Sequence, residues 1–179
     1  MFTLIPGLSF LGNNMAAQRD IDATYLRMCV EWARLSTARR RKVGCLIVKG
    51  GQIISDGYNG TPKGFDNNCE AEVDGELITK PIVLHAESNA ISKLAKSNNS
   101  SDGATLYVTC SPCFECSKLI IQSGIKRVVH CHFYRNTSGL ELLDAAHIEW
   151  EFYDISSELP ADQTQSILHS SSRLLVGKQ

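Results

Sequence analysis

The chain has 179 residues, of which 43% are hydrophobic, and its 18 basic and 19 acidic residues leave a formal net charge of −1. A chain of this length can bury one hydrophobic core, so we expect a single domain. The balanced charge creates no field that would draw the protein to a polyanion, and the apolar first twelve residues are too short to span a bilayer. Composition therefore favours neither a nucleic-acid-binding protein nor a membrane protein.

Residues 1–14 are expected to form a disordered tail. Their apolar start, MFTLIPGLSFLG, lacks the basic segment and cleavage site of a secretory signal and is interrupted by Pro6 and Gly7. A partner-binding arm is the alternative. Without a secretory signal, an odd total of seven cysteines favours a reducing cytoplasm, that of the host if the chain is viral. In such a compartment, clustered thiols hold metal more often than they form disulfides.

The first half of the chain predicts one helix, two strands and a long loop. Apolar side chains recur every three or four residues over 16–36, which predicts an amphipathic helix. Branched apolar residues predict a buried strand at 43–49, and a two-glycine turn leads into a second strand at 52–57. Residues 57–81 are rich in Gly, Asn, Asp and Pro, so we expect a long loop there, and such loops are usually functional.

The second half alternates strands and helices. Strands separated by single helices predict an α/β layered sheet with parallel pairing in this half. The expected domain covers residues 15–155, and residues 156–179 are expected to form a tail or a short peripheral helix around 165–175. The predicted helices cover 85–96, 112–124 and 140–146, and the predicted strands cover 104–109, 125–131 and 148–153.

Three thiols lie in the octapeptide TCSPCFEC and could form a disulfide, a structural metal site or a catalytic site. With Ser111 as the N-cap and Pro112 as the first helical residue, Cys113 and Cys116 share one helical face. Cys110 instead ends the preceding strand. A helix N-terminus favours the thiolate that a metal needs. No second C-x-x-C or H-x-x-x-H pair is present to complete a structural zinc site, so a catalytic site with three ligands is favoured.

His85 is the expected third ligand, and Glu87 is the expected catalytic carboxylate. H-x-E together with P-C-x-x-C is the pattern of the zinc nucleobase deaminases, in which zinc activates water and the glutamate transfers protons. On a regular helix, however, the side chains of residues two positions apart point roughly 200° away from each other. We therefore expect both residues in the first turn of the helix, at the edge of the sheet, where their side chains can converge.

Longer motifs resemble the deoxycytidylate (dCMP) deaminases of the cytidine-deaminase-like superfamily: GYNGTPKG (57–64), HAESNAI (85–91) and YVTCSPCFECSKLIIQSGIKRVV (107–129). The resemblance implies a three-layer α/β/α fold with a central mixed five-stranded sheet. It also implies hydrolysis of dCMP to dUMP and ammonia, which supplies dUMP for thymidylate synthesis. One catalytic Zn²⁺ would be bound by His85, Cys113 and Cys116, with Glu87 as the proton shuttle.

The resemblance further places Asn59 on the sugar or base of the substrate and Asn89 in the same pocket. Tyr134 and Arg135 lie in the loop after a strand's carboxyl end, where α/β proteins usually bind ligands, so we expect them to contact base and phosphate. Packing is the alternative for Tyr134. A 5′-monophosphate needs cations, and the candidates besides Arg135 are the basic run at 39–42, Lys93 and Lys96. A solvated basic face is the alternative for each of them.

The family is usually a homohexamer that dCTP activates and dTTP inhibits, each with Mg²⁺. Glycine-rich loops offer backbone N–H groups to phosphate. The nucleotide-binding residues expected in the loop are Gly57, Tyr58, Gly60, Lys63 and Gly64.

Some relatives hold a second, structural zinc ion. Here Cys69 matches a ligand position, but Ala38 and Val83 stand where metal-binding residues would be expected, so we expect one zinc. The alternative functions are deamination of dCTP or of adenosine in tRNA, and a catalytically inactive zinc domain used for assembly.

Overall fold

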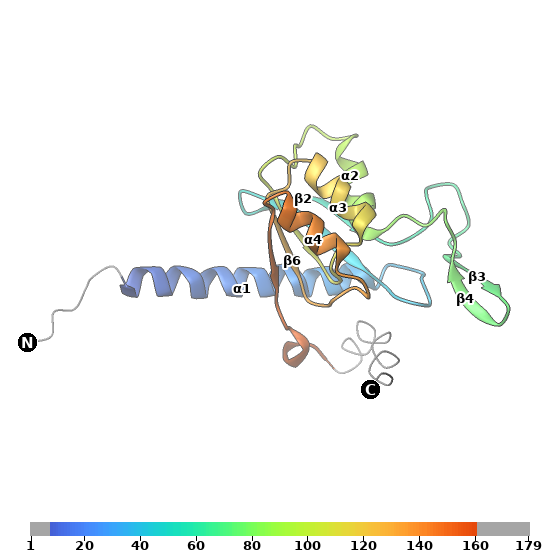
Figure 1. The fold of residues 1–179 in the computed structure, drawn as a ribbon, viewed down its shortest axis with the longest axis horizontal. Helices are drawn as coiled ribbons and strands as arrows, with labels where there is room; N and C mark the ends of the chain where they lie inside the picture. Colours follow the sequence, from blue (N-terminus) through green and yellow to red (C-terminus); the bar gives the residue numbers. More distant parts are fainter. Residues whose placement is uncertain (1–7, 161–179) are drawn as a thin grey trace, which may run out of the picture.

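The computed structural model describes residues 8–160, with side chains from Met15 onward. A five-stranded sheet of order β2-β1-β5-β6-β7 lies between two helical layers (Figure 1). The β2-β1-β5 pairs are antiparallel and the β5-β6-β7 pairs are parallel. The predicted α/β/α fold with a mixed five-stranded sheet is confirmed. The strands are β1 (Gly44–Lys49), β2 (Gln52–Tyr58), β5 (Thr105–Val108), β6 (Arg127–His130) and β7 (Glu149–Phe152), and the helices are α1 (Leu8–Ala33), α2 (Ala86–Leu94), α3 (Phe114–Gln122) and α4 (Ser138–Ala145).

The strand β1 is buried on both faces, which explains its continuous apolar sequence. Because side chains alternate along a strand, Leu46 and Val48 pack in the core beneath α1. Cys45 and Ile47 pack in the opposite core, beneath α2, α3 and α4. The sheet therefore separates a layer with one helix from a layer with three, and the predicted metal ligands lie in the second layer.

The helix α1 begins earlier than expected. Its backbone is helical from Leu8, although the apolar spacing predicts a start at residue 16 and a tail through residue 14. Once a helix is nucleated, each further residue adds one backbone hydrogen bond at little cost, so the ladder can continue beyond the packed segment. Figure 1 shows the N-terminal part of α1 extending past the edge of the sheet. Residues 1–7 lie outside the described part of the chain.

A buried ion pair fixes α1 to the sheet. The Asp22 carboxylate, which is 1% exposed, accepts hydrogen bonds from Arg127 at 2.7 and 2.9 Å and from the Tyr107 hydroxyl at 2.7 Å. Burial acts to raise the pKa of Asp22, but these hydrogen bonds and that from Gln18 outweigh it and lower the pKa. The charged form of Asp22 therefore stabilises the fold above the ordinary aspartate pKa, and that stabilisation is lost as the pH falls.

We expect Asp22→Asn to lower the free energy of unfolding by about 3 kcal/mol, because it leaves the largely buried Arg127 with the exposed Glu151 as its one charged partner among residues 15–160. Urea unfolding at neutral pH measures this loss. Asp20→Asn is the matched control, since Asp20 is exposed on the same helix. Equal stability of the two variants would contradict an anchoring role for Asp22.

The expectation of a structureless loop over 57–81 is wrong. Residues Glu70–Val73 (β3) and Glu76–Thr79 (β4) form an antiparallel hairpin. Asp74 and Gly75 make its turn with φ values of 52° and 78°. An Asp-Gly pair accepts these left-handed conformations and is a common two-residue hairpin turn, so the sequence did contain a signal for this element.

The remaining elements agree with their predicted positions, although most are shorter by one to three residues at one or both ends. A short 3₁₀ helix, Ser156–Glu158, follows β7. The predicted peripheral helix at 165–175 lies outside the described residues. Within residues 8–160, no helix is both long and apolar enough to cross a membrane.

Candidate active site

His85 is the N-cap of α2 rather than a residue of its first turn. Its backbone is extended, with φ −71° and ψ 159°, whereas Glu87 follows inside the helix. This change of backbone conformation removes the divergence that a regular helix would impose between positions two apart. Both side chains can therefore face the same site, as predicted, but because His85 precedes the helix.

The helix α3 begins at Phe114, so the expected N-cap at Ser111 and helical start at Pro112 are wrong. Cys113 is the N-cap, with an extended backbone of φ −75° and ψ 169°. The Ser111 hydroxyl instead accepts a hydrogen bond from the backbone N–H of Tyr134 at 2.7 Å, which ties it to the loop after β6. Cys116 lies in the first turn of α3. Each of the two helices thus has one predicted ligand as its N-cap, His85 for α2 and Cys113 for α3.

The three predicted ligands come together. The Nδ1 atom of His85 is 3.4 Å from the Sγ of Cys113 and 3.4 Å from the Sγ of Cys116, and all three ligand atoms lie within 4.8 Å of one another. One imidazole nitrogen and two sulfurs are donors that zinc prefers, and three protein ligands leave a fourth position open, as in catalytic sites. Cys116 is buried, whereas His85 is exposed, so the group opens toward the surface on the histidine side.

The two thiols are electrostatically coupled. Hydrogen bonds from Cys116 and His85 lower the pKa of Cys113 to about 3, against the opposing effect of burial. The same contact with Cys113, together with burial, raises the pKa of Cys116 far above its ordinary value. The pair therefore shares one proton and one negative charge, and a divalent cation between them would take the place of the proton.

Glu87 is buried beside this group, with only 4% of its surface exposed. Burial raises the pKa of its carboxyl to about 7, although the nearby His85 and a hydrogen bond with Cys116 act to lower it. A carboxyl with a pKa near neutrality can both accept and return a proton at physiological pH. The geometry and the pKa of Glu87 thus fit the predicted proton shuttle.

Two glycines let the segments that carry the predicted ligands approach their neighbours. A Cβ atom on Gly57 of β2 would lie 2.1 Å from the carbonyl oxygen of Ala86, in the first turn of α2. A Cβ atom on Gly139 of α4 would lie 2.1 Å from the carbonyl oxygen of Pro112, next to Cys113. Gly139 was not predicted as a site residue, because the predicted helix began at residue 140 and Gly139 was therefore placed in the preceding loop.

The predicted substrate residues Asn59 and Asn89 both bond to backbone. Asn59 accepts from the N–H of Val43 at 2.8 Å and donates to the carbonyl of Arg41 at 2.9 Å. Asn89 donates to the carbonyl of Tyr58 at 2.9 Å, which joins α2 to the end of β2. These contacts give both asparagines a role in holding the loops around the site, and a contact with substrate stays a prediction.

Tyr134 and Arg135 lie in the loop after β6, next to the segment that leads into α3. The Ser111 N–H donates to the carbonyl of His132 at 2.7 Å, so this loop and the residues before Cys113 are bonded in both directions. The Arg135 guanidinium lies 5.6 Å from the centroid of the half-buried Tyr134 ring. The pair is therefore near the predicted active site, with Arg135 exposed.

The predicted nucleotide loop divides into two parts. Gly57 is buried and packs on α2, and the half-buried Tyr58 ends β2. Gly60 exchanges backbone hydrogen bonds of 2.9 and 3.1 Å with Leu84, immediately before His85. Lys63 and Gly64 are exposed at the far end of the loop. The loop is thus connected directly to the segment that carries the histidine ligand.

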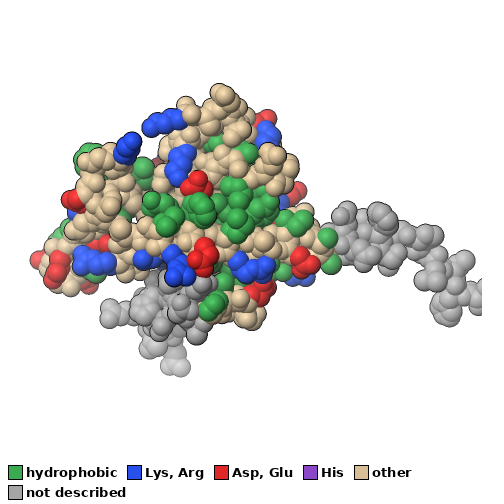
Figure 2. Space-filling model, turned by 180° about the vertical axis from the view of Figure 1, so that it is seen from behind, with side chains coloured by type: hydrophobic (Ala, Val, Ile, Leu, Met, Phe, Trp, Pro, Cys, Tyr) green, Lys and Arg blue, Asp and Glu red, His purple; other side chains and the backbone are tan. Residues whose placement is uncertain are grey.

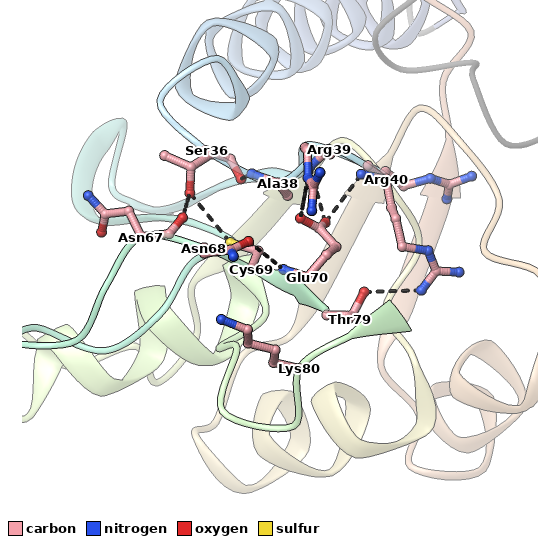
Figure 3. Close-up of polar contacts among 12 residues, drawn as sticks. Ser36, Ala38, Arg39, Arg40, Asn67, Asn68, Cys69, Glu70, Thr79 and Lys80 are labelled. Atoms are coloured by element: carbon pink, nitrogen blue, oxygen red, sulfur yellow. Dashed lines mark hydrogen bonds and ion pairs between the residues drawn. The ribbon is translucent and has the colours of Figure 1, made fainter. Parts of the chain in front are cut away.

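The residues around Cys69, which matches a ligand position of the second zinc in some relatives, form a hydrogen-bond network (Figure 3). Cys69 is buried, and its sulfur lies 3.5 Å from the Thr37 hydroxyl. The neighbouring Glu70 carboxylate, 1% exposed, accepts from the backbone N–H groups of Arg39 and Arg40 at 3.1 to 3.2 Å. Glu70 thus joins the β3-β4 hairpin to the loop before β1, and sequence reasoning did not identify it.

All seven cysteines are free thiols, so none forms a disulfide. Cys29 and Cys45 are fully buried core residues, as expected. Cys110 contacts the Arg41 guanidinium at 2.9 Å; burial raises the pKa of the Cys110 thiol to about 11 although Arg41 opposes this. Burial and Arg41 also lower the pKa of His132, whose Nε2 lies 3.3 Å from the same guanidinium.

Comparisons with known proteins match this geometry. The family model for the cytidine and deoxycytidylate deaminase zinc-binding region matches residues 19–132, which include all three ligands and Glu87. The deoxycytidylate deaminase of Enterobacteria phage T2 is 36% identical, in an alignment that covers 62% of this chain and 84% of the phage protein. The deoxycytidylate deaminase of Schizosaccharomyces pombe is 34% identical over 74% of this chain and 44% of that protein.

Among solved structures, the crystal structure of dCMP deaminase from the cyanophage S-TIM5, in complex with dCMP and dUMP, is similar to the whole domain. It has a TM-score of 0.71 and 44% sequence identity, and the match covers 75% of this chain and 97% of that one. The resemblance predicted from the sequence is therefore confirmed. With the zinc-binding pattern, the fold and the ligand geometry in agreement, the chain belongs to the cytidine and deoxycytidylate deaminase family.

Proposed function

We propose that the protein is a zinc-dependent hydrolase that converts dCMP to dUMP and ammonia. The observation that carries this proposal is the convergence of His85, Cys113 and Cys116 beside the buried carboxyl of Glu87. Deoxycytidylate deaminases that are 36% and 34% identical, and a cyanophage relative solved with dCMP and dUMP, support this choice of substrate. The product would supply dUMP for thymidylate synthesis.

The chemistry follows from the residues at the site. A zinc ion held by the three ligands would supply Lewis-acid activation of water for attack at C4 of the cytosine. Glu87 takes a proton from the water and delivers it to N3, which makes the ring more electrophilic. Glu87 then carries the remaining proton of the hydroxyl added at C4 to the amino group, so that the C4–N bond breaks, ammonia leaves and the C4 carbonyl forms. Because Glu87 is buried, these transfers are shielded from bulk water.

Asn59, Asn89, Tyr134 and Arg135 are proposed to surround the nucleotide. The loop after β6 supports this assignment, because it is bonded to Ser111 next to the ligand segment. Tyr134 presents a half-buried ring that can stack on a base, and Arg135 is an exposed cation near it. Asn59 and Asn89 hold the loops around the site, and the side-chain amide of each can form a further hydrogen bond.

We also propose allosteric control by dCTP and, with opposite sign, by dTTP, each with Mg²⁺. The loop at 57–64 supports this, since Gly60 is hydrogen-bonded to Leu84 and an effector on the loop would act on the segment that carries His85. A homohexamer in the cytoplasm is part of the same proposal. Figure 2 shows hydrophobic side chains gathered on one face of the molecule, a feature that favours contact with further copies.

The test is product identity with purified, zinc-loaded protein. We expect ammonia and dUMP from dCMP, little turnover of CMP or deoxycytidine, and no inosine in tRNA. The activity should disappear after dialysis against a chelator and return with Zn²⁺. Stimulation by dCTP and inhibition by dTTP, each with Mg²⁺, would support the regulatory proposal, and light scattering would test the hexamer.

The other functions give different results in the same assay. Conversion of dCTP without conversion of dCMP would leave the zinc chemistry intact but contradict the substrate assignment. Inosine in tRNA would indicate an RNA deaminase. Zinc-loaded protein without any turnover would indicate an inactive assembly domain.

A further inference from the structure

His130, the last residue of β6, is a buried titratable residue that the proposed mechanism does not use. Its side chain is 0% exposed. Because side chains alternate along a strand, it faces the same side of the sheet as Val128, in the core beneath α2, α3 and α4. The ring centroids of Phe133, Trp150 and Phe152 lie 4.9, 5.8 and 5.7 Å from that of the imidazole. This packing holds the imidazole in one orientation.

The imidazole of His130 is bonded to the backbone of the loop between β6 and α4 (Figure 1). Its Nδ1 atom lies 3.1 Å from the carbonyl oxygen of His132, and because a carbonyl only accepts, Nδ1 carries the proton. The same carbonyl accepts from the N–H of Ser111 at 2.7 Å, and the Ser111 hydroxyl accepts from the N–H of Tyr134. One carbonyl thus receives two donors, which fixes the peptide plane from which the chain continues to Tyr134.

The other ring nitrogen of His130, Nε2, has no hydrogen-bond partner in the described part of the chain. Protonation would place a charged N–H group among aromatic rings without an acceptor, and burial accordingly lowers the pKa of His130 to about 4. The ring is therefore neutral, with its proton on Nδ1, throughout the physiological pH range. A phenylalanine would fill the same space without an unpartnered atom. The property that distinguishes the histidine here is therefore its bond to the His132 carbonyl.

We propose that His130 is a positioning residue, whose bond to the His132 carbonyl holds the loop after β6 in the conformation that presents Tyr134 to the base of the substrate. This rests on the proposed function, since the contact between Tyr134 and the base is part of it. Because His130 is fully buried, it acts on the nucleotide through the loop and not by contact. Loss of the bond therefore weakens nucleotide binding and leaves the proton transfers of Glu87 intact.

The test separates the hydrogen bond from the packing with two substitutions. His130→Phe keeps an aromatic ring and removes the donor, whereas His130→Asn places an amide nitrogen near the position of Nδ1 but fills less space. With zinc-loaded protein, we expect His130→Phe to raise the KM for dCMP and the Kd for dUMP by about tenfold and to change kcat by less than about threefold, because part of a stacking contact with the base is lost.

His130→Asn should keep the KM and the Kd within about threefold of the wild type, although the smaller side chain lowers its melting temperature below that of His130→Phe. The variant that packs better should thus bind worse. A purely structural role for His130 would give the opposite order, since affinity would then follow stability.

Val129→Ala is the matched control for loss of stability. Val129 is fully buried in the same strand, but its side chain faces the core beneath α1. This variant should have a lower melting temperature and an unchanged KM for dCMP. Tyr134→Leu tests whether His130 acts through Tyr134, because His130→Phe added to Tyr134→Leu should then raise KM no further. Additive effects of the two substitutions would contradict this route.

Hydrogen exchange of residues 131–137, measured without nucleotide, tests the loop independently of the substrate. Exchange should be faster in His130→Phe than in the wild type or in His130→Asn. Equal exchange in all three proteins, or an unchanged KM and Kd in His130→Phe, would overturn the inference. If the wild type forms no dUMP but this exchange pattern is found, the proposed function is contradicted, whereas the role of His130 in holding the loop is supported.

Discussion

Glu87→Gln should bind zinc as the wild type does and lose at least about a hundredfold in kcat for dCMP. The amide has the shape of the carboxyl but cannot take a proton from water or hold one for N3 and the leaving amine. Because Glu87 is 4% exposed, bulk water has little access to replace it as a proton carrier. Zinc content by elemental analysis and dUMP formation by chromatography measure the two properties separately.

Glu115→Gln is the matched control for this variant. Glu115 lies in the first turn of α3, beside Cys116, but its side chain is exposed and, in the described part of the chain, its one ion pair is with Lys118. It should retain wild-type turnover. Loss of zinc from Glu87→Gln would mean that the carboxyl holds the ligands in place rather than moving protons. Turnover within threefold of the wild type would exclude Glu87 as the proton shuttle.

The convergence of His85, Cys113 and Cys116 was predictable because the spacing of these residues in the sequence is typical of zinc ligands. In H-x-E and in P-C-x-x-C, a metal donor is followed by a second functional group two or three positions later. The two groups of each motif are therefore close in space whatever the rest of the fold is. The backbone that brings them together was not predictable. His85 and Cys113 are extended N-caps, and Ser111, which has the better capping side chain, bonds to the loop after β6 instead. Tertiary contacts therefore overrode the local capping preference.

The sheet was predictable from alternating strands and helices, but the hairpin at β3 and β4 was not identified. Its strands are four residues long and Glu70 is their one buried residue, so they lack the apolar alternation that marks a buried strand. The Asp-Gly turn was the available signal. The role of Glu70 depends on burial and on backbone donors 30 residues away, and no pattern in one sequence contains that information.

Glycine at position 57 illustrates how a resemblance and a structure can assign different roles to one residue. The motif places Gly57 in a nucleotide-binding loop, whereas its geometry shows a packing requirement. A Cβ there would lie 2.1 Å from the carbonyl oxygen of Ala86 and 2.7 Å from the backbone nitrogen of Ala90. Both are backbone atoms of α2, so the clash cannot be relieved by rotating a side chain.

Gly57→Ala is expected to lower the free energy of unfolding by about 1 to 3 kcal/mol, because an atom is inserted into a packed interface. It should also weaken zinc binding and reduce kcat by about a hundredfold, since a shift of the first turn of α2 moves His85 and Glu87 together. Thermal unfolding, competitive zinc titration and turnover corrected for the folded fraction measure these three effects.

Gly44→Ala separates loss of stability from loss of the site. A Cβ on Gly44 would lie 2.0 Å from the carbonyl oxygen of Cys29, so the clash is of the same kind but falls on α1, across the sheet from the ligands. Both variants should be destabilised, and only Gly57→Ala should lose zinc affinity per folded molecule. If the two variants lose zinc equally, the metal site depends on the stability of the whole domain. If only Gly57→Ala does, the contact between β2 and α2 sets the distance between the histidine ligand and the two thiols.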